Sequence, residues 1–228
     1  MTSAELLTDA FGRVRDAVHQ AVAGLTAEQL AARLDPDGNS IAWTTWHLAR
    51  IEDDHVADAF GVPQVWPRFR DRFGLPFGAT DTGYGHGSGE VAMVRVPSGE
   101  LLTGYHDAVH AQTVRLVSGV TDADLSRVVD EAWDPPVTLG VRMVSVISDG
   151  LQHAGQAAFI RGVLLHNPGG DDPPVTPRSP PAHLPNPLHL AVVSRGWEAL
   201  PFPRAHPSSP QATRAHAATA ARRLPCRR

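Results

Sequence analysis

Residues 138–165 read TLGVRMVSVISDGLQHAGQAAFIRGVLL, a long apolar segment that contains no proline. A segment of this length is too long for an ordinary strand and is typical of a helix packed in a protein core. Asp149 and His153 lie four positions apart inside it, so a helix brings both side chains to one face. The segment therefore predicts a core helix that carries two polar side chains on its inner face.

Three more segments have apolar residues at helical spacing, namely 3–25, 41–60 and 98–119. The second of them, IAWTTWHLARIEDDHVADAF, follows Asn39 and Ser40, either of which can cap its first turn. No alternating strand pattern accompanies these long helices. The sequence thus predicts an all-α protein, a four-helix bundle, and the interior of such a bundle is a common place for a metal site built from facing helices.

The connections between the predicted long helices differ in character. Residues 25–34 and 121–131 are each expected to add a short helix. Residues 62–97 form a long loop rich in proline and glycine, yet aromatic side chains are interleaved with them. A loop of this length is either functional or disordered, and its aromatic content argues against disorder. We therefore expect a lid or pocket wall, with these aromatics among its contacts: Trp66, Phe69 and Phe73.

The composition changes after residue 166, which divides the chain into a bundle domain (1–166) and a tail (167–228). The domain has 12 arginines against 21 acidic residues, a balance of −9, whereas the tail has 8 arginines against 3, a balance of +5. Of the chain's 20 prolines, 13 fall in the tail. Such a Pro/Arg/Ala-rich segment without apolar periodicity is expected to be disordered, and translation past a native stop in another frame would produce a similar composition.

Several classes of protein are disfavoured by composition. The acidic balance of the domain does not favour binding to nucleic acid. Cys226 is the only cysteine, which excludes an intrachain disulfide and a cysteine-based metal site. The first residues are charged and amphipathic, and no run of about eighteen apolar residues is present, so we expect a cytoplasmic protein without membrane association. All 20 basic residues are arginine, a bias that suggests a bacterium with GC-rich codons.

His47 is the residue that gives Asp149 and His153 a possible common role. It lies on the inner stripe of the 41–60 helix, next to Trp43 and Trp46. Two imidazoles and one carboxylate can bind Zn²⁺, Ni²⁺ or Fe²⁺ and leave coordination positions open, as in a catalytic site. The sequence therefore offers three candidate metal ligands, one from one helix and two from another.

Simpler interpretations of these histidines stay open. Asp149 and His153 can form only a local hydrogen bond, and a histidine beside tryptophan is commonly a core residue. A rival pair, His106 and His110, has the same spacing in the third long helix, but its polar neighbours favour a solvated face. His55, near the end of the second long helix, is expected to be exposed or to support the site.

The motifs NSIAWTTWHLARIEDDHV (39–56) and SDGLQHAGQ (148–156) resemble those of the DinB/YfiT-like superfamily, in particular its actinobacterial mycothiol-transferase-like branch. The resemblance covers the whole predicted bundle and none of the tail. It implies a divalent metal held by one histidine of the second helix and two ligands one turn apart on the last, which here correspond to His47, Asp149 and His153. The commonest pattern of the superfamily has histidine at both last-helix positions, so Asp149 is a departure from it.

The resemblance also implies a function, since relatives of this type act as thiol-dependent transferases or isomerases. A thiol on a divalent cation is deprotonated, and the thiolate is the nucleophile. The bundle has no cysteine, so the sulfur is expected to come from a low-molecular-weight thiol such as mycothiol, with a small electrophile as second substrate. Arg50 and Gln156 are candidates to orient polar substrate groups.

Two other functions stay open on the sequence. One is a metal-dependent hydrolase or isomerase that uses metal-bound water, with Asp54 or Glu52 as the base. The other is a non-catalytic bundle that binds a metal or a partner, for example as a homodimer. Thiol consumption with a generic electrophile would separate the first of these from the transferase.

Overall fold

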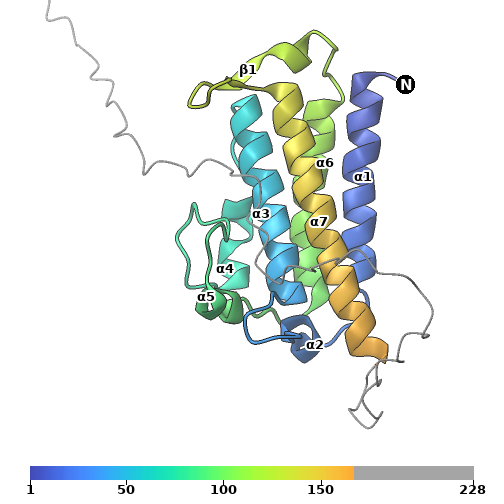
Figure 1. Cartoon of the computed structure of the whole chain (residues 1–228), viewed down its shortest axis with the longest axis vertical. Coiled ribbons are helices and arrows are strands. Elements are labelled where there is room, and N and C mark those ends of the chain that lie inside the picture. Colours follow the sequence, from blue (N-terminus) through green and yellow to red (C-terminus); the bar gives the residue numbers. More distant parts are fainter. Residues whose placement is uncertain (167–228) are drawn as a thin grey trace, which may run out of the picture. The chain divides into compact units, whose positions relative to one another are not determined.

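The computed structural model describes residues 1–166, and the predicted tail lies outside the described residues. Four long helices dominate it: α1 (Ser3–Val22), α3 (Ile41–Phe60), α6 (Gly99–Val117) and α7 (Leu139–His166) (Figure 1). The shorter elements are α2 (Ala27–Ala31), η1 (Trp66–Arg68), α4 (Arg70–Phe73), α5 (Ser88–Met93), η2 (Asp124–Ser126), β1 (Val128–Asp130) and β2 (Val137–Thr138). The prediction of an all-α fold with four long helices is confirmed.

The bounds of α3 follow from its end residues. The Ser40 side chain accepts a hydrogen bond from the Trp43 backbone N–H at 3.1 Å, which satisfies one of the free donors of the first turn. At the other end Gly61 adopts a left-handed conformation with φ of 64°, which glycine reaches without steric cost. These two local signals explain why the predicted and observed bounds of this helix coincide.

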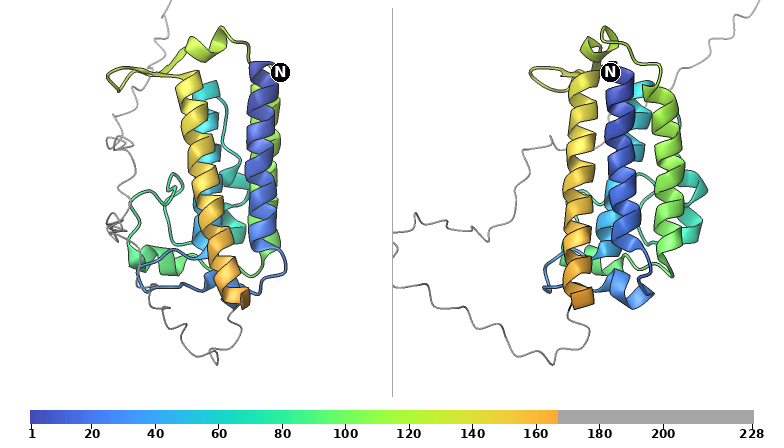
Figure 2. Two further views of the ribbon diagram at one scale, coloured as in Figure 1. Left: turned by 45° about the vertical axis from the view of Figure 1, so that its right-hand side comes forward. Right: turned by 90° about the vertical axis from the view of Figure 1, so that its right-hand side faces the viewer.

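The four long helices lie side by side, with α7 and α6 each packed against both α1 and α3 (Figure 2). The start of α7 contacts the end of α3 through Arg142 and His55, and its later part contacts the end of α1 through Arg161 and the Ala23 carbonyl. Thus α7 is antiparallel to α3 and parallel to α1, while α3 and α6 run in the same direction (Figure 1). Parallel neighbours need a connection that returns along the bundle, which is why residues 62–97 are so long.

The returning segment packs on α6 through its aromatic side chains. Trp66, Phe69 and Phe73 surround Tyr105, with ring centroids 5.2, 5.3 and 5.8 Å from the tyrosine ring. All four side chains are buried. Trp66, Phe69 and Phe73 of the predicted loop therefore belong to the hydrophobic core, and short helices η1, α4 and α5 interrupt the loop.

The prediction of a short helix over 121–131 is wrong for its second half. Only the three residues of η2 are helical, and β1 pairs antiparallel with β2, with Val128 opposite Thr138. Val128 and Val129 are β-branched and fit an extended strand better than a helix. The partner strand lies after the Pro135-Pro136 turn, so the pairing depends on residues outside the segment on which the prediction was based.

The apolar core of the described residues consists of two clusters of buried side chains. One cluster includes Val14, Trp46 and Ala154, and the other includes Phe11, Val56 and Met143. Three of the long helices also contribute buried or half-buried polar groups: His47, Arg50, Glu52 and Asp53 from α3, His106 from α6, and Asp149 and His153 from α7. Burying polar groups is costly unless they are paired, so these buried polar residues are the candidates for a functional site.

Two glycines of α7 give a test of how closely the helices pack. A Cβ at Gly150 would lie 3.0 Å from Val14 Cγ1 on α1, whereas none of the described atoms lies within 4 Å of a Cβ at Gly155. Gly155→Ala is expected to raise the free energy of unfolding by about 0.5–1 kcal/mol, since glycine is a poor helix former. Gly150→Leu is expected to lower it by about 1–3 kcal/mol through overpacking. Chemical denaturation measures both, and equal effects would contradict the α1–α7 contact.

Candidate metal centre

The fold brings His47, Asp149 and His153 together across the α3–α7 contact. One ligand atom of each residue can be chosen so that all three lie within 4.8 Å of one another. His47 is buried with 5% of its surface exposed, and the other two side chains are partly buried. Within residues 1–166 this is the group of three or more potential ligands that has metal-site geometry.

The ring of His47 is held in one orientation. Its Nδ1 lies 2.6 Å from the Thr82 carbonyl oxygen, and its ring stacks on Trp43 at 4.7 Å with an interplanar angle of 11°. A carbonyl only accepts, so Nδ1 carries the proton and Nε2 keeps its lone pair. Burial, followed by the nearby His153, lowers the pKa of His47 to about 4. The imidazole is therefore neutral at neutral pH, which is the form that binds metals.

Asp149 and His153 supply the other two groups. Nδ1 of His153 lies 3.1 Å from Gln156 Oε1, and its Nε2 lies 3.5 Å from Asp149 Oδ1. Burial lowers the pKa of His153, but the hydrogen bond and the charge of Asp149 outweigh it and leave the pKa raised. The second carboxylate oxygen, Oδ2 of Asp149, is buried and has no hydrogen-bond partner among the described residues.

This unpartnered oxygen is the test of whether the three residues fit a divalent cation. A buried carboxylate oxygen without a partner is costly, and of the two in the described residues, Asp149 Oδ2 and Glu52 Oε1, that of Asp149 belongs to the group of three potential ligands. The separation of 3.5 Å between His153 and Asp149 is at the long limit of a hydrogen bond. One imidazole nitrogen from each histidine and one carboxylate form a donor set that suits Zn²⁺, Ni²⁺ or Fe²⁺, with His153 releasing its proton when the ion binds, so the residues present fit the ion.

The rival histidine pair lies elsewhere in the bundle. His106 is fully buried, and its Nε2 lies 3.2 Å from Glu52 Oε2 on α3, while His110 is partly buried. The expectation of a solvated face is therefore wrong for His106, because α6 turns this position towards α3, where Glu52 supplies a polar partner. Neither histidine joins the group of His47.

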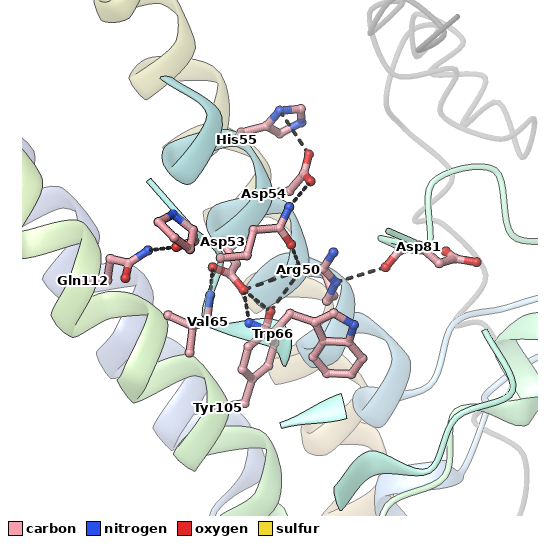
Figure 3. Close-up of polar contacts among 11 residues, drawn as sticks. Arg50, Asp53, Asp54, His55, Val65, Trp66, Asp81, Tyr105 and Gln112 are labelled. Carbon is pink, nitrogen blue, oxygen red and sulfur yellow. Dashed lines mark hydrogen bonds and ion pairs between the residues drawn. The ribbon is translucent and has the colours of Figure 1, made fainter. Parts of the chain in front are cut away.

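The other polar residues singled out in the sequence have supporting contacts. Gln156 accepts from His153, and Asp54 accepts from Gln64 Nε2 at 2.6 Å. His55 Nδ1 lies 2.6 Å from Arg142 Nη1, so His55 belongs to the contact between α3 and the start of α7. Arg50 is fully buried and contacts residues of the returning segment, as Figure 3 shows.

Two residues near the site were missed in the sequence. Thr82 contributes through its backbone carbonyl, and every residue has a carbonyl, so no sequence signal points to it. His86 Nδ1 accepts a hydrogen bond from Trp43 Nε1 at 3.1 Å, which fixes the indole that stacks on His47. A histidine in the glycine-rich stretch GYGHGSG (83–89) was the available signal for this second residue.

Comparison with known proteins agrees with the fold. The family model described as mycothiol S-transferase matches residues 6–165, so the chain belongs to the mycothiol S-transferase family of the DinB-like superfamily. No curated protein matches the chain. A solved structure, described as the conserved protein of locus from Enterococcus faecalis, is similar with 28% identity and a TM-score of 0.68, covering 73% of this chain and 99% of that chain.

The long helices differ from membrane-spanning helices. Of those in the described part of the chain, none combines the length and the apolar character that crossing a membrane requires.

Proposed function

We propose that the protein is a metal-dependent thiol S-transferase that joins a low-molecular-weight thiol of the mycothiol type to a small electrophile. The observation that carries the proposal is the buried, unpartnered Asp149 Oδ2 beside two imidazoles whose other ring nitrogens have oxygen partners. The family assignment supports a thiol substrate.

The roles of the protein groups follow from their contacts. His47, Asp149 and His153 hold a divalent cation, which when bound lowers the pKa of a thiol and so makes the thiolate available at neutral pH. The Thr82 carbonyl and Gln156 orient the two imidazoles through their Nδ1 protons. Trp43, which stacks on His47 and meets His153 edge-on at 6.2 Å, gives the site an apolar side that limits access of water.

The nucleophilic sulfur comes from the substrate. Cys226 is the chain's single cysteine, and it lies outside the described residues and outside the region that the family model matches. In the transfer, the thiolate sulfur bonds to the electrophilic carbon and the leaving group departs with the electron pair. We infer that Asp149, in place of a third imidazole, gives the site a harder set of donor atoms. Such a set can bind Fe²⁺ or Zn²⁺.

An activity assay tests the proposal directly. Protein loaded with Zn²⁺ is expected to consume a low-molecular-weight thiol in the presence of a chromogenic aryl halide, and Asp149→Ala is expected to return the rate to background. Asp9→Ala, which removes a surface carboxylate, is the matched control and should keep the wild-type rate. Equal thiol consumption by loaded wild type and Asp149→Ala would contradict the proposal, and ester hydrolysis without thiol consumption would favour the hydrolase.

A further inference from the structure

Residues 81–86, called the strap below, cross α3 next to His47 without supplying a metal ligand. The Thr82 carbonyl accepts the Nδ1–H of His47 at 2.6 Å. The strap is also fastened at its end, where His86 accepts from Trp43 Nε1 at 3.1 Å. Within the strap, Asp81 Oδ1 accepts the Gly83 backbone N–H at 2.8 Å and lies 3.1 Å from His86 Nε2. Hydrogen bonds within the strap thus hold its backbone turn together, and those with His47 and Trp43 attach it to α3.

The start of the strap is anchored by a buried arginine. Arg50, with 0% of its surface exposed, donates from Nε to the Asp81 carbonyl at 3.0 Å (Figure 3). Its Nη1 donates to Gln64 Oε1 at 3.0 Å, and its Cζ lies 5.2 Å from the centroid of the Trp66 ring, whereas Nη2 is buried without a hydrogen-bond partner among the described residues. Since a buried, planar guanidinium with several partners has little freedom, it fixes the position of the neighbouring Thr82 carbonyl.

Gly83 permits the strap to approach so closely. Its φ is +88°, and a Cβ at this position would lie 3.0 Å from His47 Nδ1 and 2.8 Å from Trp46 Cζ3. Gly85 in the same strap also has a positive φ, +77°, but a Cβ there would have no described atom within 4 Å. The two glycines therefore share the backbone requirement and differ in their contact with the site.

We propose that Arg50, Asp81 and Gly83 are positioning residues that hold the Thr82 carbonyl against His47 and so select the imidazole tautomer that offers Nε2 to the metal. The inference rests on the proposed function and deepens it. A neutral imidazole without an acceptor at Nδ1 distributes its proton between both nitrogens, and the form protonated at Nε2 cannot coordinate through that atom. The strap removes this second form and fixes the direction of the lone pair.

Metal affinity of the full-length protein gives the first readout. Gly83→Ala is expected to weaken Zn²⁺ binding by about 10–100-fold, the usual effect of losing a partner that orients a ligand. Gly85→Ala carries the same penalty for positive φ without the contact, and its Zn²⁺ affinity should stay within about threefold of wild type. If Gly83→Ala binds Zn²⁺ as tightly as Gly85→Ala, the strap does not position His47.

The tautomer of His47 gives a second readout that needs no metal. In metal-free wild type and in Gly85→Ala, ¹⁵N NMR at pH 7.5 should show a neutral His47 protonated at Nδ1, and in Gly83→Ala it should show a mixture of the two neutral tautomers, one protonated at Nδ1 and the other at Nε2. A wild-type His47 protonated at Nε2 would overturn the inference even if the protein binds Zn²⁺. Conversely, Nδ1 protonation together with no Zn²⁺ binding by wild type would sink the proposed function and leave the positioning role supported.

A second variant covers the case in which Gly83→Ala does not fold. Asp81→Ala removes the carboxylate that accepts the Gly83 N–H and contacts His86. Because the Asp81 side chain is 31% exposed, we expect only a small effect on folding. It should weaken Zn²⁺ binding and mix the His47 tautomers in the same direction as Gly83→Ala. Unchanged affinity and an unchanged tautomer in Asp81→Ala would contradict the role of the strap.

Discussion

Alanine at His47, Asp149 or His153 is expected to remove most of the divalent metal from the purified protein, because two ligands hold an ion far more weakly than three. Elemental analysis of each purified variant measures the content. Stability gives an independent measurement, since an ion that binds only the folded state adds about 2.7 kcal/mol at a free concentration of a hundred times Kd. A chelator should therefore lower the Tm of wild type and leave the Tm of the three variants unchanged.

The matched control for these variants is His110→Ala, which removes a partly buried histidine of α6 outside the group. Its metal content should equal that of wild type. Asp149→His should also retain metal, since imidazole can take the same coordination position. Full metal content in all three alanine variants would show that the ion binds elsewhere, and Asp149 and His153 would then form only a hydrogen bond.

Asp53→Ala is expected to lower the free energy of unfolding by about 3–5 kcal/mol, because it leaves the buried charge of Arg50 without its carboxylate. Asp53 is buried, lies 3.5 Å from Arg50 Nη1 and accepts hydrogen bonds from the backbone N–H groups of Val65 and Trp66 at 2.8 and 2.7 Å (Figure 3). It also accepts from the Tyr105 hydroxyl at 2.9 Å. One carboxylate thus fastens the returning segment to both α3 and α6.

Urea denaturation of the metal-free protein measures this effect without interference from the ion. Asp9→Ala, which removes a carboxylate paired with Arg13 on the solvent side of α1, is the control and should show no measurable change. Burial raises the pKa of Asp53, whereas its hydrogen bonds from the two backbone N–H groups and from Tyr105 lower it. The charged form of this buried carboxylate therefore depends on those hydrogen bonds. A loss no larger than that of Asp9→Ala would mean that the returning segment is held by its aromatic side chains alone.

The part of the fold that the sequence predicted well is the part that local interactions determine. The segment 41–60 has its cap, its apolar spacing and its terminal glycine within the helix or next to it, and the prediction was right to the residue. The pairing of Val128 with Thr138 was missed, since neither strand is stable or recognisable without the other. The length of 62–97 was apparent, but its cause, the parallel direction of α3 and α6, exists only in three dimensions.

In the candidate site, too, the features that local spacing determines were predicted and those that depend on contacts between distant segments were missed. His47, Asp149 and His153 were identified because helical spacing shows which side chains share a face, and the structure places them together. The Thr82 carbonyl was missed because hydrogen bonds to the backbone leave no trace in residue types. Glu52 and His106 were assigned other roles, since spacing within one helix does not reveal which neighbouring helix a buried polar side chain meets.

The order of the three proposed ligands along the chain would determine when the protein acquires an ion at this site during synthesis. His47 emerges from the ribosome about a hundred residues before Asp149 and His153, and both late ligands belong to α7, the last helix of the described region. A nascent chain that ends before α7 carries one ligand, so it competes poorly for cellular metal. With the proposed site, ion uptake would follow the docking of α7, and a bound ion would mark a completed bundle and not a folding intermediate.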